Sequence, residues 1–202
     1  MPESVTRLVL ASASPRRSEL LRQIGVAHRV VIADIDEQTL PGESARDCVM
    51  RLAREKALRT AARTGDAAVA VLGADTAVVI DGDMLGKPRG PADALAMLER
   101  LSARQHEVLS AVALAHRGFV RSELSRSVVQ FRAITRAEAE AYWATAEPRD
   151  KAGGYAVQGY GAVFIESLQG SYSGVMGLPL FETAALLAAA GVPMWQAPGQ
   201  HE

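Results

Sequence analysis

The chain has little of what builds covalent or metal-stabilised scaffolds. Only one of its 202 residues is a cysteine, Cys48, which excludes an internal disulfide and a zinc site made from several cysteines. No run approaches the ~20 apolar residues of a membrane-spanning helix, and the N-terminus lacks the basic and then apolar pattern of a signal peptide. The histidines are scattered without metal-ligand spacing (His28, His106, His116 and His201). These absences predict a cytoplasmic protein without a membrane partner.

Charge of one sign is not in excess either. The chain has 22 Lys and Arg against 23 Asp and Glu, so it lacks the broad positive surface expected of a protein that binds duplex nucleic acid. A local basic cluster in such a neutral protein suits a small anionic ligand better. The length allows one well-cored domain or two closely packed lobes, and no internal repeat or linker interrupts it. We therefore expect residues 1–202 to form a single domain of two lobes, with a tail that frays from about residue 192.

Hydrophobic periodicity predicts a mixed α/β protein. The expected strands are 7–11, 28–32, 67–74 with an extended continuation at 76–80, 83–86, 107–116, 119–134 and 162–167, and the expected helices are 16–24, 44–64, 91–102, 135–146 and 180–190. Crossovers typical of parallel strands dominate the first half, and an antiparallel hairpin lies in the middle. Residues 147–161 are rich in glycine and are expected to be irregular.

The first strand runs through a turn of small residues into a helix that opens with two arginines. Ser14 is a natural N-cap, and Pro15 suits the first helical position because the amide it lacks would be unpaired there. The start of a helix attracts anions, and the guanidiniums of Arg16 and Arg17 match phosphate oxygens bidentately. The turn therefore predicts a polyphosphate clamp. The alternative is a capped surface helix whose arginines lie in solvent.

Two charged residues occur next to apolar segments. A helical stripe of Val49, Leu52 and Ala53 is continued by Lys56. The ammonium of Lys56 either reaches solvent from the edge of this stripe or points into a cleft that holds acids or phosphates. Asp75 ends the apolar run of a central strand, a place where α/β sheets bind ligands. A carboxylate there needs a metal, a lysine or a catalytic water as its partner, unless it only caps a turn.

A cluster of acids precedes the second helix. Asp34, Asp36 and Glu37 form either a solvated loop or the source of one metal-binding carboxylate. Mg²⁺ typically takes one or two carboxylates together with substrate phosphate. One acid from this cluster and Asp75 would meet that need.

Two glycine-containing segments lack the context of known phosphate-binding motifs. Gly86-Lys87-Pro88 has neither the spacing nor the strand–loop–helix setting of a P-loop, and residues 153–161 do not have the spacing of a dinucleotide fingerprint. The second segment would still let backbone approach a ligand closely, and Gln158 could hydrogen-bond the edge of a base. The alternative is an ordinary flexible connection.

Several segments, taken in order, resemble the Maf family of nucleoside triphosphate pyrophosphatases. They are Leu10-Ala11-Ser12-Ala13-Ser14-Pro15-Arg16-Arg17, Asp36-Glu37, Arg51-Leu52-Ala53-Arg54-Glu55-Lys56-Ala57, Gly73-Ala74-Asp75-Thr76, Gly86-Lys87-Pro88, Asp150-Lys151-Ala152-Gly153 through Gln158-Gly159, and Gly170-Ser171-Tyr172 through Leu180. The resemblance implies an elongated α/β fold, with two lobes around a central cleft, related to the inosine triphosphatase fold and often dimeric. It also implies hydrolysis of a nucleoside triphosphate to the monophosphate and pyrophosphate with a divalent cation, Mg²⁺ or Mn²⁺. Family members were first named as inhibitors of septum formation, so a role in cell division is a second implied theme.

The resemblance also implies roles for single residues. Asp75 would orient or deprotonate the attacking water and share a metal ion with Glu37. The implied catalytic residues are Asp75, Lys56, Lys87 and Arg17, and the implied substrate-binding residues are Ser12, Ser14, Arg16, Arg17, Thr76 and Gln158. Arg16, Thr76 and Gln158 match the branch of the family that prefers dTTP and UTP. The branch that prefers 7-methyl-GTP has Trp, Gln and Glu at these places.

Two other interpretations stay open. One is a pyrophosphatase that acts on purine or modified nucleotides. The other is a regulator of cell division that binds a nucleotide as a signal without hydrolysing it. The intact set of acids and cations argues against the second.

Overall fold

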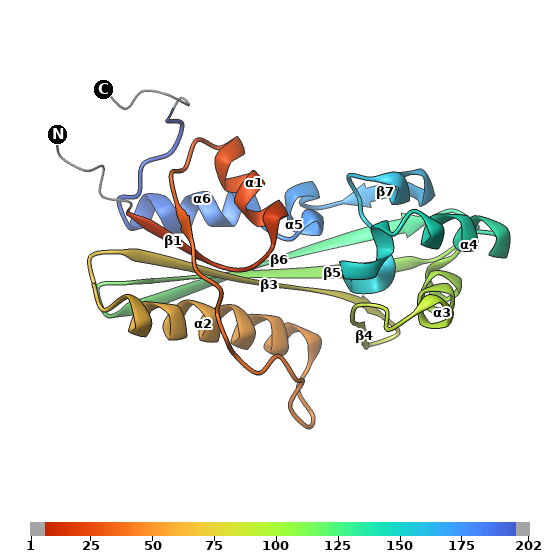
Figure 1. Cartoon of the computed structure of the whole chain (residues 1–202), viewed down its shortest axis with the longest axis horizontal. Helices are drawn as coiled ribbons and strands as arrows, with labels where there is room; N and C mark the ends of the chain where they lie inside the picture. Colours follow the sequence, from red (N-terminus) through yellow and green to blue (C-terminus); the bar gives the residue numbers. More distant parts are fainter. Residues whose placement is uncertain (1–6, 197–202) are drawn as a thin grey trace.

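Residues 7–196 are described by a computed structural model, in which a seven-stranded mixed sheet is flanked by helices (Figure 1). The strands are β1 (Leu8–Ala11), β2 (Arg29–Val30), β3 (Ala70–Ile80), β4 (Asp83–Leu85), β5 (Gln105–His116), β6 (Phe119–Phe131) and β7 (Ile165–Gln169). The helices are α1 (Pro15–Gln23), α2 (Ala45–Thr64), α3 (Pro91–Leu101), α4 (Arg136–Ala144), α5 (Tyr172–Met176) and α6 (Leu180–Ala189), with the 3-10 helices η1 (Glu147–Asp150), η2 (Ala152–Gly154) and η3 (Tyr160–Phe164). The predicted fold class, a mixed α/β sheet flanked by helices, is confirmed.

The sheet has the order β2-β1-β3-β5-β6-β7, with β4 paired to β3. β1 is parallel to both of its neighbours, and the other pairs are antiparallel. The long strands β3, β5 and β6 run along the molecule and join its two packed ends (Figure 1). At one end α2 covers one face of the sheet while α1 and α6 cover the other, and at the opposite end α3 and α4 gather near β4 and β7. Among the residues that the structure describes, no helix is both long and apolar enough to cross a membrane.

Successive side chains of β1 and β3 point to opposite faces of the sheet, and apolar residues occur on both faces, so helices cover both. Leu8 and Leu10 of β1, with Leu72 of β3, belong to the core beneath α1 and α6. Val9 and Val71 point the other way, into the core beneath α2. Because these strands are buried on both faces, they read in the sequence as continuous apolar runs.

The other end of the molecule has an aromatic core. The ring of Phe131 packs edge-on against His106 and Tyr155, with centroid distances of 4.9 and 4.8 Å. The Tyr155 hydroxyl and Nε2 of His106 form a hydrogen bond of 2.7 Å. Burial lowers the pKa of His106 to about 4, so this ring is neutral at pH 7. His106 is thus a packed core residue.

One edge of β3 is interrupted. Pairing with β1 ends at Ala11 and Gly73, and pairing with β4 runs from Val78 to Ile80. β5 pairs along the opposite edge without a break from Val71 to Val79. Among the described strands, residues 74–77 therefore have no partner on the β1 side, and we call this interval the notch. It lies where β1 ends and where the chain leaving β4 returns, so segments far apart in the sequence converge on it.

Three local predictions differ from the structure. The strand expected at 162–167 begins only at Ile165, because the amides of Tyr160 and Gly161 donate to the Glu147 carboxylate and the preceding backbone forms η3. The short helix α5 was not predicted; it begins where the hydroxyl of Ser171 accepts a hydrogen bond from the amide of Gly174. Ser14 occupies the N-cap of α1, but its side chain makes no capping hydrogen bond.

Backbone hydrogen bonds hold the C-terminal segment up to residue 196, beyond the point where fraying was expected. The amides of Trp195 and Gln196 donate to the carbonyls of Ile24 and Gly25 at 2.8 and 3.1 Å. Val192 is also buried in the core beneath α1 and α6. The prediction of a frayed tail is therefore wrong for residues 192–196. Residues 197–202 of the predicted tail lie outside the described range.

Gly73 is a point of close packing whose replacement we expect to destabilise the protein. An added Cβ would overlap the carbonyl oxygen of Ala53 and would lie 2.7 Å from the amide nitrogen of Ala57, both in the backbone of α2. Helix and sheet would have to separate, and overpacking of this kind costs about 1–3 kcal/mol. Chemical denaturation should therefore show a lower midpoint for Gly73→Ala. Gly86→Ala is the control, because nothing lies within 4 Å of its added Cβ; equal midpoints for the two variants would contradict the close packing.

Candidate active site

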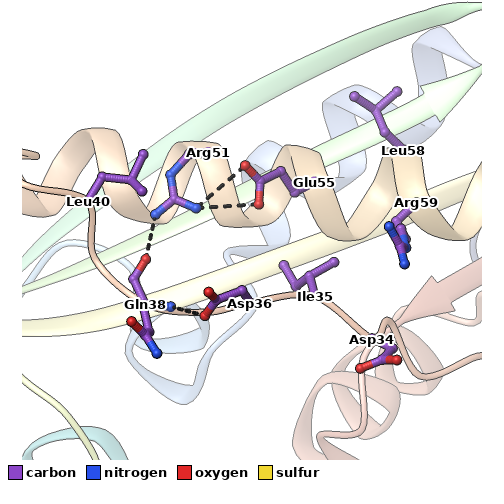
Figure 2. A pocket seen from close by; sticks show the side chains of 9 residues that line it. All are labelled: Asp34, Ile35, Asp36, Gln38, Leu40, Arg51, Glu55, Leu58 and Arg59. Atoms are coloured by element: carbon purple, nitrogen blue, oxygen red, sulfur yellow. Dashed lines mark hydrogen bonds and ion pairs between the residues drawn. The ribbon is translucent and has the colours of Figure 1, made fainter.

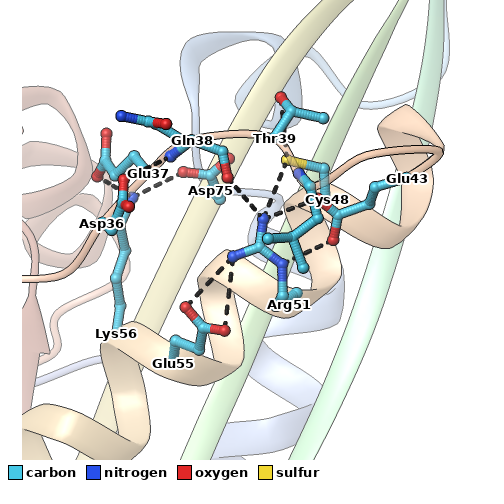
Figure 3. A network of polar contacts seen from close by, with 11 residues as sticks. Asp36, Glu37, Gln38, Thr39, Glu43, Cys48, Arg51, Glu55, Lys56 and Asp75 are labelled. Carbon is cyan, nitrogen blue, oxygen red and sulfur yellow. Dashed lines mark hydrogen bonds and ion pairs between the residues drawn. The ribbon is translucent and has the colours of Figure 1, made fainter.

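The ammonium of Lys56 joins two carboxylates that come from different elements (Figure 3). Its Nζ lies 2.7 Å from Oδ1 of Asp75 on β3 and 2.6 Å from Oε1 of Glu37, in the loop before α2. The close approach of α2 to Gly73 lets Lys56 reach the strand. Only 8% of the Lys56 side chain is exposed, so the prediction that it faces acids is confirmed and the alternative of a solvent-reaching lysine is wrong.

Positive charge around Glu37 keeps this carboxyl ionised. Burial would raise the pKa of Glu37, but the hydrogen bond and charge of Lys56, with the charges of Lys87 and Arg17, bring it below its usual value. Because the folded-state pKa is depressed, the stabilisation from Glu37 is present above its ordinary pKa and is lost as pH falls through the lowered one. Lys87 and Arg17 thus act electrostatically on the same carboxylate as Lys56.

Arg17 is enclosed by neutral oxygen atoms. Its Nε donates to the carbonyl of Gly177 at 2.8 Å, and its Nη1 donates to the carbonyl of Ala74 at 2.9 Å and to Oγ of Ser12 at 3.2 Å. In residues 7–196 no carboxylate lies within ion-pair distance of this guanidinium. Burial lowers the pKa of Arg17, and the nearby charge of Asp75 opposes that effect. Arg17 ties the start of α1 to the notch, and its role as a phosphate ligand stays a prediction.

Thr76 points to the opposite face of β3 from Asp75, as neighbouring residues of a strand do. Its Oγ1 lies 3.0 Å from Oγ of Ser110 on β5 and 3.4 Å from Nη2 of Arg17. Oγ of Ser110 donates in turn to the carbonyl of Gly174 at 2.6 Å. Two residues on opposite faces can contact one ligand only where the edge of the strand is open, and the notch provides such an edge.

The side chain of Arg16 joins α1 to the glycine-rich segment. Its Nη1 is 3.3 Å from Oδ2 of Asp150 on η1, and Nζ of Lys151 is 2.6 Å from Oδ1 of the same carboxylate. Since Arg16 is paired and Arg17 is enclosed, the alternative with both arginines in solvent is wrong. The role of Arg16 in choosing the nucleotide stays a prediction.

The remaining predicted residues do not touch the acids directly. Gln158 and Lys87 are exposed, and neither has a hydrogen bond or ion pair within the described part of the chain. Oγ of Ser12 accepts from the amide of Ser14 at 3.2 Å, which shapes the turn after β1. Lys87 follows β4, which runs antiparallel to β3 and so leads back toward the notch.

Two residues that sequence reasoning missed hold the segment on either side of Gln158. The carboxylate of Glu147 accepts a hydrogen bond of 3.0 Å from the amide of Gly161 and one of 2.7 Å from the hydroxyl of Tyr142. The same hydroxyl oxygen accepts from the amide of Ala156 at 3.1 Å. The backbone is therefore fixed on both sides of Gln158 while its side chain stays free to meet a ligand. No sequence signal marked these residues. Glu147 lies in an irregular segment, and Tyr142 reads as an ordinary buried residue of the helix α4.

Glu37 and Asp75 offer donors suited to a hard divalent cation, which prefers oxygen ligands. Both carboxylates lie within hydrogen-bond distance of one nitrogen atom, Nζ of Lys56, so they converge on one point. Residues 7–196 contain no group of three or more Asp, Glu, His or Cys residues that could hold a metal. Only the chemistry of these two carboxylates suits such a cation: Nζ of Lys56 occupies the point on which they converge, and the remaining ligands would have to be substrate phosphates and water.

The match to a family model and the matches to related sequences agree with each other. The family model described as Maf-like protein matches residues 7–190. The dTTP/UTP pyrophosphatases of Methylobacillus flagellatus and Saccharophagus degradans are each 52% identical to this chain, over 95% and 94% of it and over 96% and 91% of their own lengths. The dTTP/UTP pyrophosphatase of Anaeromyxobacter dehalogenans is 51% identical over 95% of this chain and 98% of its own. The solved structure of the Staphylococcus aureus Ham1 protein aligns with a TM-score of 0.45 and 13% identity, over 90% of this chain and 96% of that one. Because the family model spans most of the chain and these relatives share about half of its residues, the chain belongs to the Maf family.

Proposed function

We propose that this protein hydrolyses dTTP and UTP to the nucleoside monophosphate and pyrophosphate. The observation that carries the proposal is the convergence of Asp75 and Glu37 on the buried ammonium of Lys56, beside the open edge of β3. Such a group of opposite charges can orient a water molecule and bind phosphates in one place. The names of relatives that are about half identical over nearly their whole length support the same activity.

Asp75 is the proposed base for attack of water on the α-phosphorus. Its carboxylate is largely buried and lies on a strand that is hydrogen-bonded to β5, so its direction is fixed. Lys56 holds one carboxylate oxygen, Oδ1, which leaves the other oxygen to accept a hydrogen bond from water. A divalent cation bound by Glu37 and Asp75 would polarise the phosphate and make a bound water more acidic.

The cations of the site are proposed to bind the phosphates and to stabilise the leaving pyrophosphate. Arg16 and Arg17 lie in the first turn of α1, where helix N–H groups also favour anions. Lys87 is exposed and unpaired in the described residues, so it can reach a phosphate without breaking an ion pair. Charge that develops on the leaving group is stabilised best by such pre-positioned cations.

Base selection is proposed for Thr76 and Gln158. The side chain of Gln158 is exposed while the backbone around it is held by Glu147 and Tyr142, and an amide can both donate to and accept from the edge of a pyrimidine. Arg16 is proposed to assist, since its pairing with Asp150 links α1 to the same segment.

A substrate panel tests this function. With Mg²⁺ or Mn²⁺ present, pyrophosphate release from dTTP and UTP should exceed release from ATP, GTP and 7-methyl-GTP by at least about 10-fold in kcat/KM, because a site that hydrogen-bonds one base discriminates against others. EDTA should abolish turnover. Modified pyrimidine triphosphates belong in the same panel to compare ordinary with modified bases. A preference for purine nucleotides would contradict the proposed specificity, and turnover that persists in EDTA would contradict the metal requirement.

A further inference from the structure

Residues 33–43, the acidic loop, carry Glu37 to its place opposite Asp75. The loop is largely exposed and contains no helix or strand. Its one described backbone–backbone hydrogen bond within the loop joins the amide of Glu43 to the carbonyl of Leu40 at 3.0 Å. The position of Glu37 must therefore come from side chains that reach the loop.

Arg51 of α2 makes most of these contacts (Figure 3). Its Nε and Nη2 bind the two carboxylate oxygens of Glu43 at 2.6 and 2.7 Å. Nη2 also donates to the carbonyl of Gln38 at 3.0 Å, directly after Glu37 in the chain. One guanidinium thus fixes the end of the acidic loop and the residue next to the proposed metal ligand.

Few other contacts can replace this anchor. A cavity of about 970 Å³ lies between the acidic loop and α2, with Ile35 and Leu40 on the loop side and Arg51 and Arg59 on the helix side (Figure 2). Side chains of the loop therefore do not pack tightly onto the helix over this stretch. Arg51 crosses from α2 to the loop as a hydrogen-bonded link, whereas Arg59 lines the same cavity with no hydrogen bond or ion pair in the described residues.

The Arg51–Glu43 pair is well suited to hold a loop. Only 21% of the Arg51 side chain and 9% of the Glu43 side chain are exposed, and the contact is bidentate. The hydrogen bonds from Arg51 lower the pKa of Glu43 to about 2, and those from Glu43 raise the pKa of Arg51. Glu43 also accepts from the amide of Leu40 at 3.0 Å, so the pair tightens the loop itself.

We propose that Arg51 is a positioning residue, which keeps Glu37 opposite Asp75 by holding the Gln38 carbonyl and Glu43. The inference deepens the proposed function, on which its kinetic consequence rests. Lys56 also binds Glu37, but it does so through the same carboxylate that a cation would use. Arg51 binds the backbone instead, so it can hold the loop whether Glu37 faces Lys56 or a metal.

Loss of Arg51 should weaken cation binding because the acidic loop would spend less of its time in the docked position. If the loop is docked about one-tenth of the time in Arg51→Met, the apparent affinity for the cation falls about 10-fold. Titration of the protein with Mn²⁺ alone should show this weakening, as should the Mg²⁺ concentration that gives half-maximal hydrolysis of UTP. Arg51→Lys, which keeps the charge but loses the fork, should lie between wild type and Arg51→Met.

The test is a double-mutant cycle with a readout that does not depend on activity. Arg51→Met is made alone and together with Glu37→Gln, and Arg59→Met is the matched control on the same helix. A protease that cleaves after glutamate should cut at Glu37 about 10-fold faster in Arg51→Met than in wild type or Arg59→Met. In the Glu37→Gln background, Arg51→Met should cause no further loss of Mn²⁺ affinity.

The outcomes separate this inference from the proposed function. An equally large effect of Arg51→Met on Mn²⁺ affinity with and without Glu37, or unchanged cleavage at Glu37, would overturn the positioning role. A wild-type protein that hydrolyses no nucleoside triphosphate would overturn the proposed function, while cleavage and Mn²⁺ binding would still decide whether Arg51 docks the loop.

Discussion

Asp75→Asn should lose roughly 10²–10⁴-fold in kcat, the range found when a general base is removed. Asparagine nearly preserves the shape of the side chain, but it carries no negative charge and cannot take a proton from water. The strand around residue 75 is held by its pairing with β5, so the fold should be retained. Pyrophosphate release from UTP at saturating Mg²⁺ measures the loss, and circular dichroism checks the fold.

Asp83→Asn is the matched control for this variant. Asp83 lies on the neighbouring strand β4, where its exposed carboxylate pairs with Arg100 at 2.9 Å. Its replacement should leave kcat unchanged. Near-normal turnover by Asp75→Asn with unchanged dependence on metal would reject Asp75 as the base.

Lys56→Met should damage both activity and stability. Without the ammonium, the carboxylates of Asp75 and Glu37 lose their shared ion-pair partner, in a place where 15% of the Asp75 side chain is exposed. Breaking a buried ion pair costs 3–5 kcal/mol, and the 59% exposure of Glu37 points to the lower end, about 3 kcal/mol. Denaturant titration measures this loss, and kcat/KM for UTP should fall at least about 10²-fold because the ammonium that pre-positions the Asp75 and Glu37 carboxylates is lost.

The pH dependence of Lys56→Met gives an independent check. Lys56 is the main group that lowers the pKa of Glu37 against the opposing effect of burial. Its removal should raise that pKa, so the acid limb of kcat/KM should move to higher pH. Lys87→Met serves as the comparison, because Lys87 is exposed and its loss should reduce activity without lowering stability. An acid limb that does not move in Lys56→Met would contradict the assigned contact.

Much of the fold could be predicted because local chemistry and tertiary structure agree. The capping box of Thr135 and Glu138 starts α4 as expected. Asp81 and Gly82 both adopt positive φ in the turn between β3 and β4, which is the conformation that the Asp-Gly pair favours. Helical periodicity places Lys56 at the end of the apolar stripe of α2, but it leaves open whether the ammonium reaches solvent or faces acids, which only the contacts with Glu37 and Asp75 decide.

The parts that could not be predicted are contacts of irregular segments. Periodicity does not fix the direction of a loop side chain, so the residues alone left open which of Asp34, Asp36 and Glu37 would face Asp75. The bidentate contact of Arg51 with Glu43 and the hydrogen bonds of Glu147 likewise join groups across irregular backbone. The notch was missed for another reason: it depends on where β1 and β4 stop along β3, which only the pairing register reveals.

The three strands that cross the molecule also determine how it can respond to a nucleotide. The ends are joined by the continuous ladder that β3, β5 and β6 share, so a movement of one end against the other would have to bend or twist this sheet. We therefore expect the irregular segments that border the notch to adjust to a bound nucleotide more readily than the paired strand that carries Asp75.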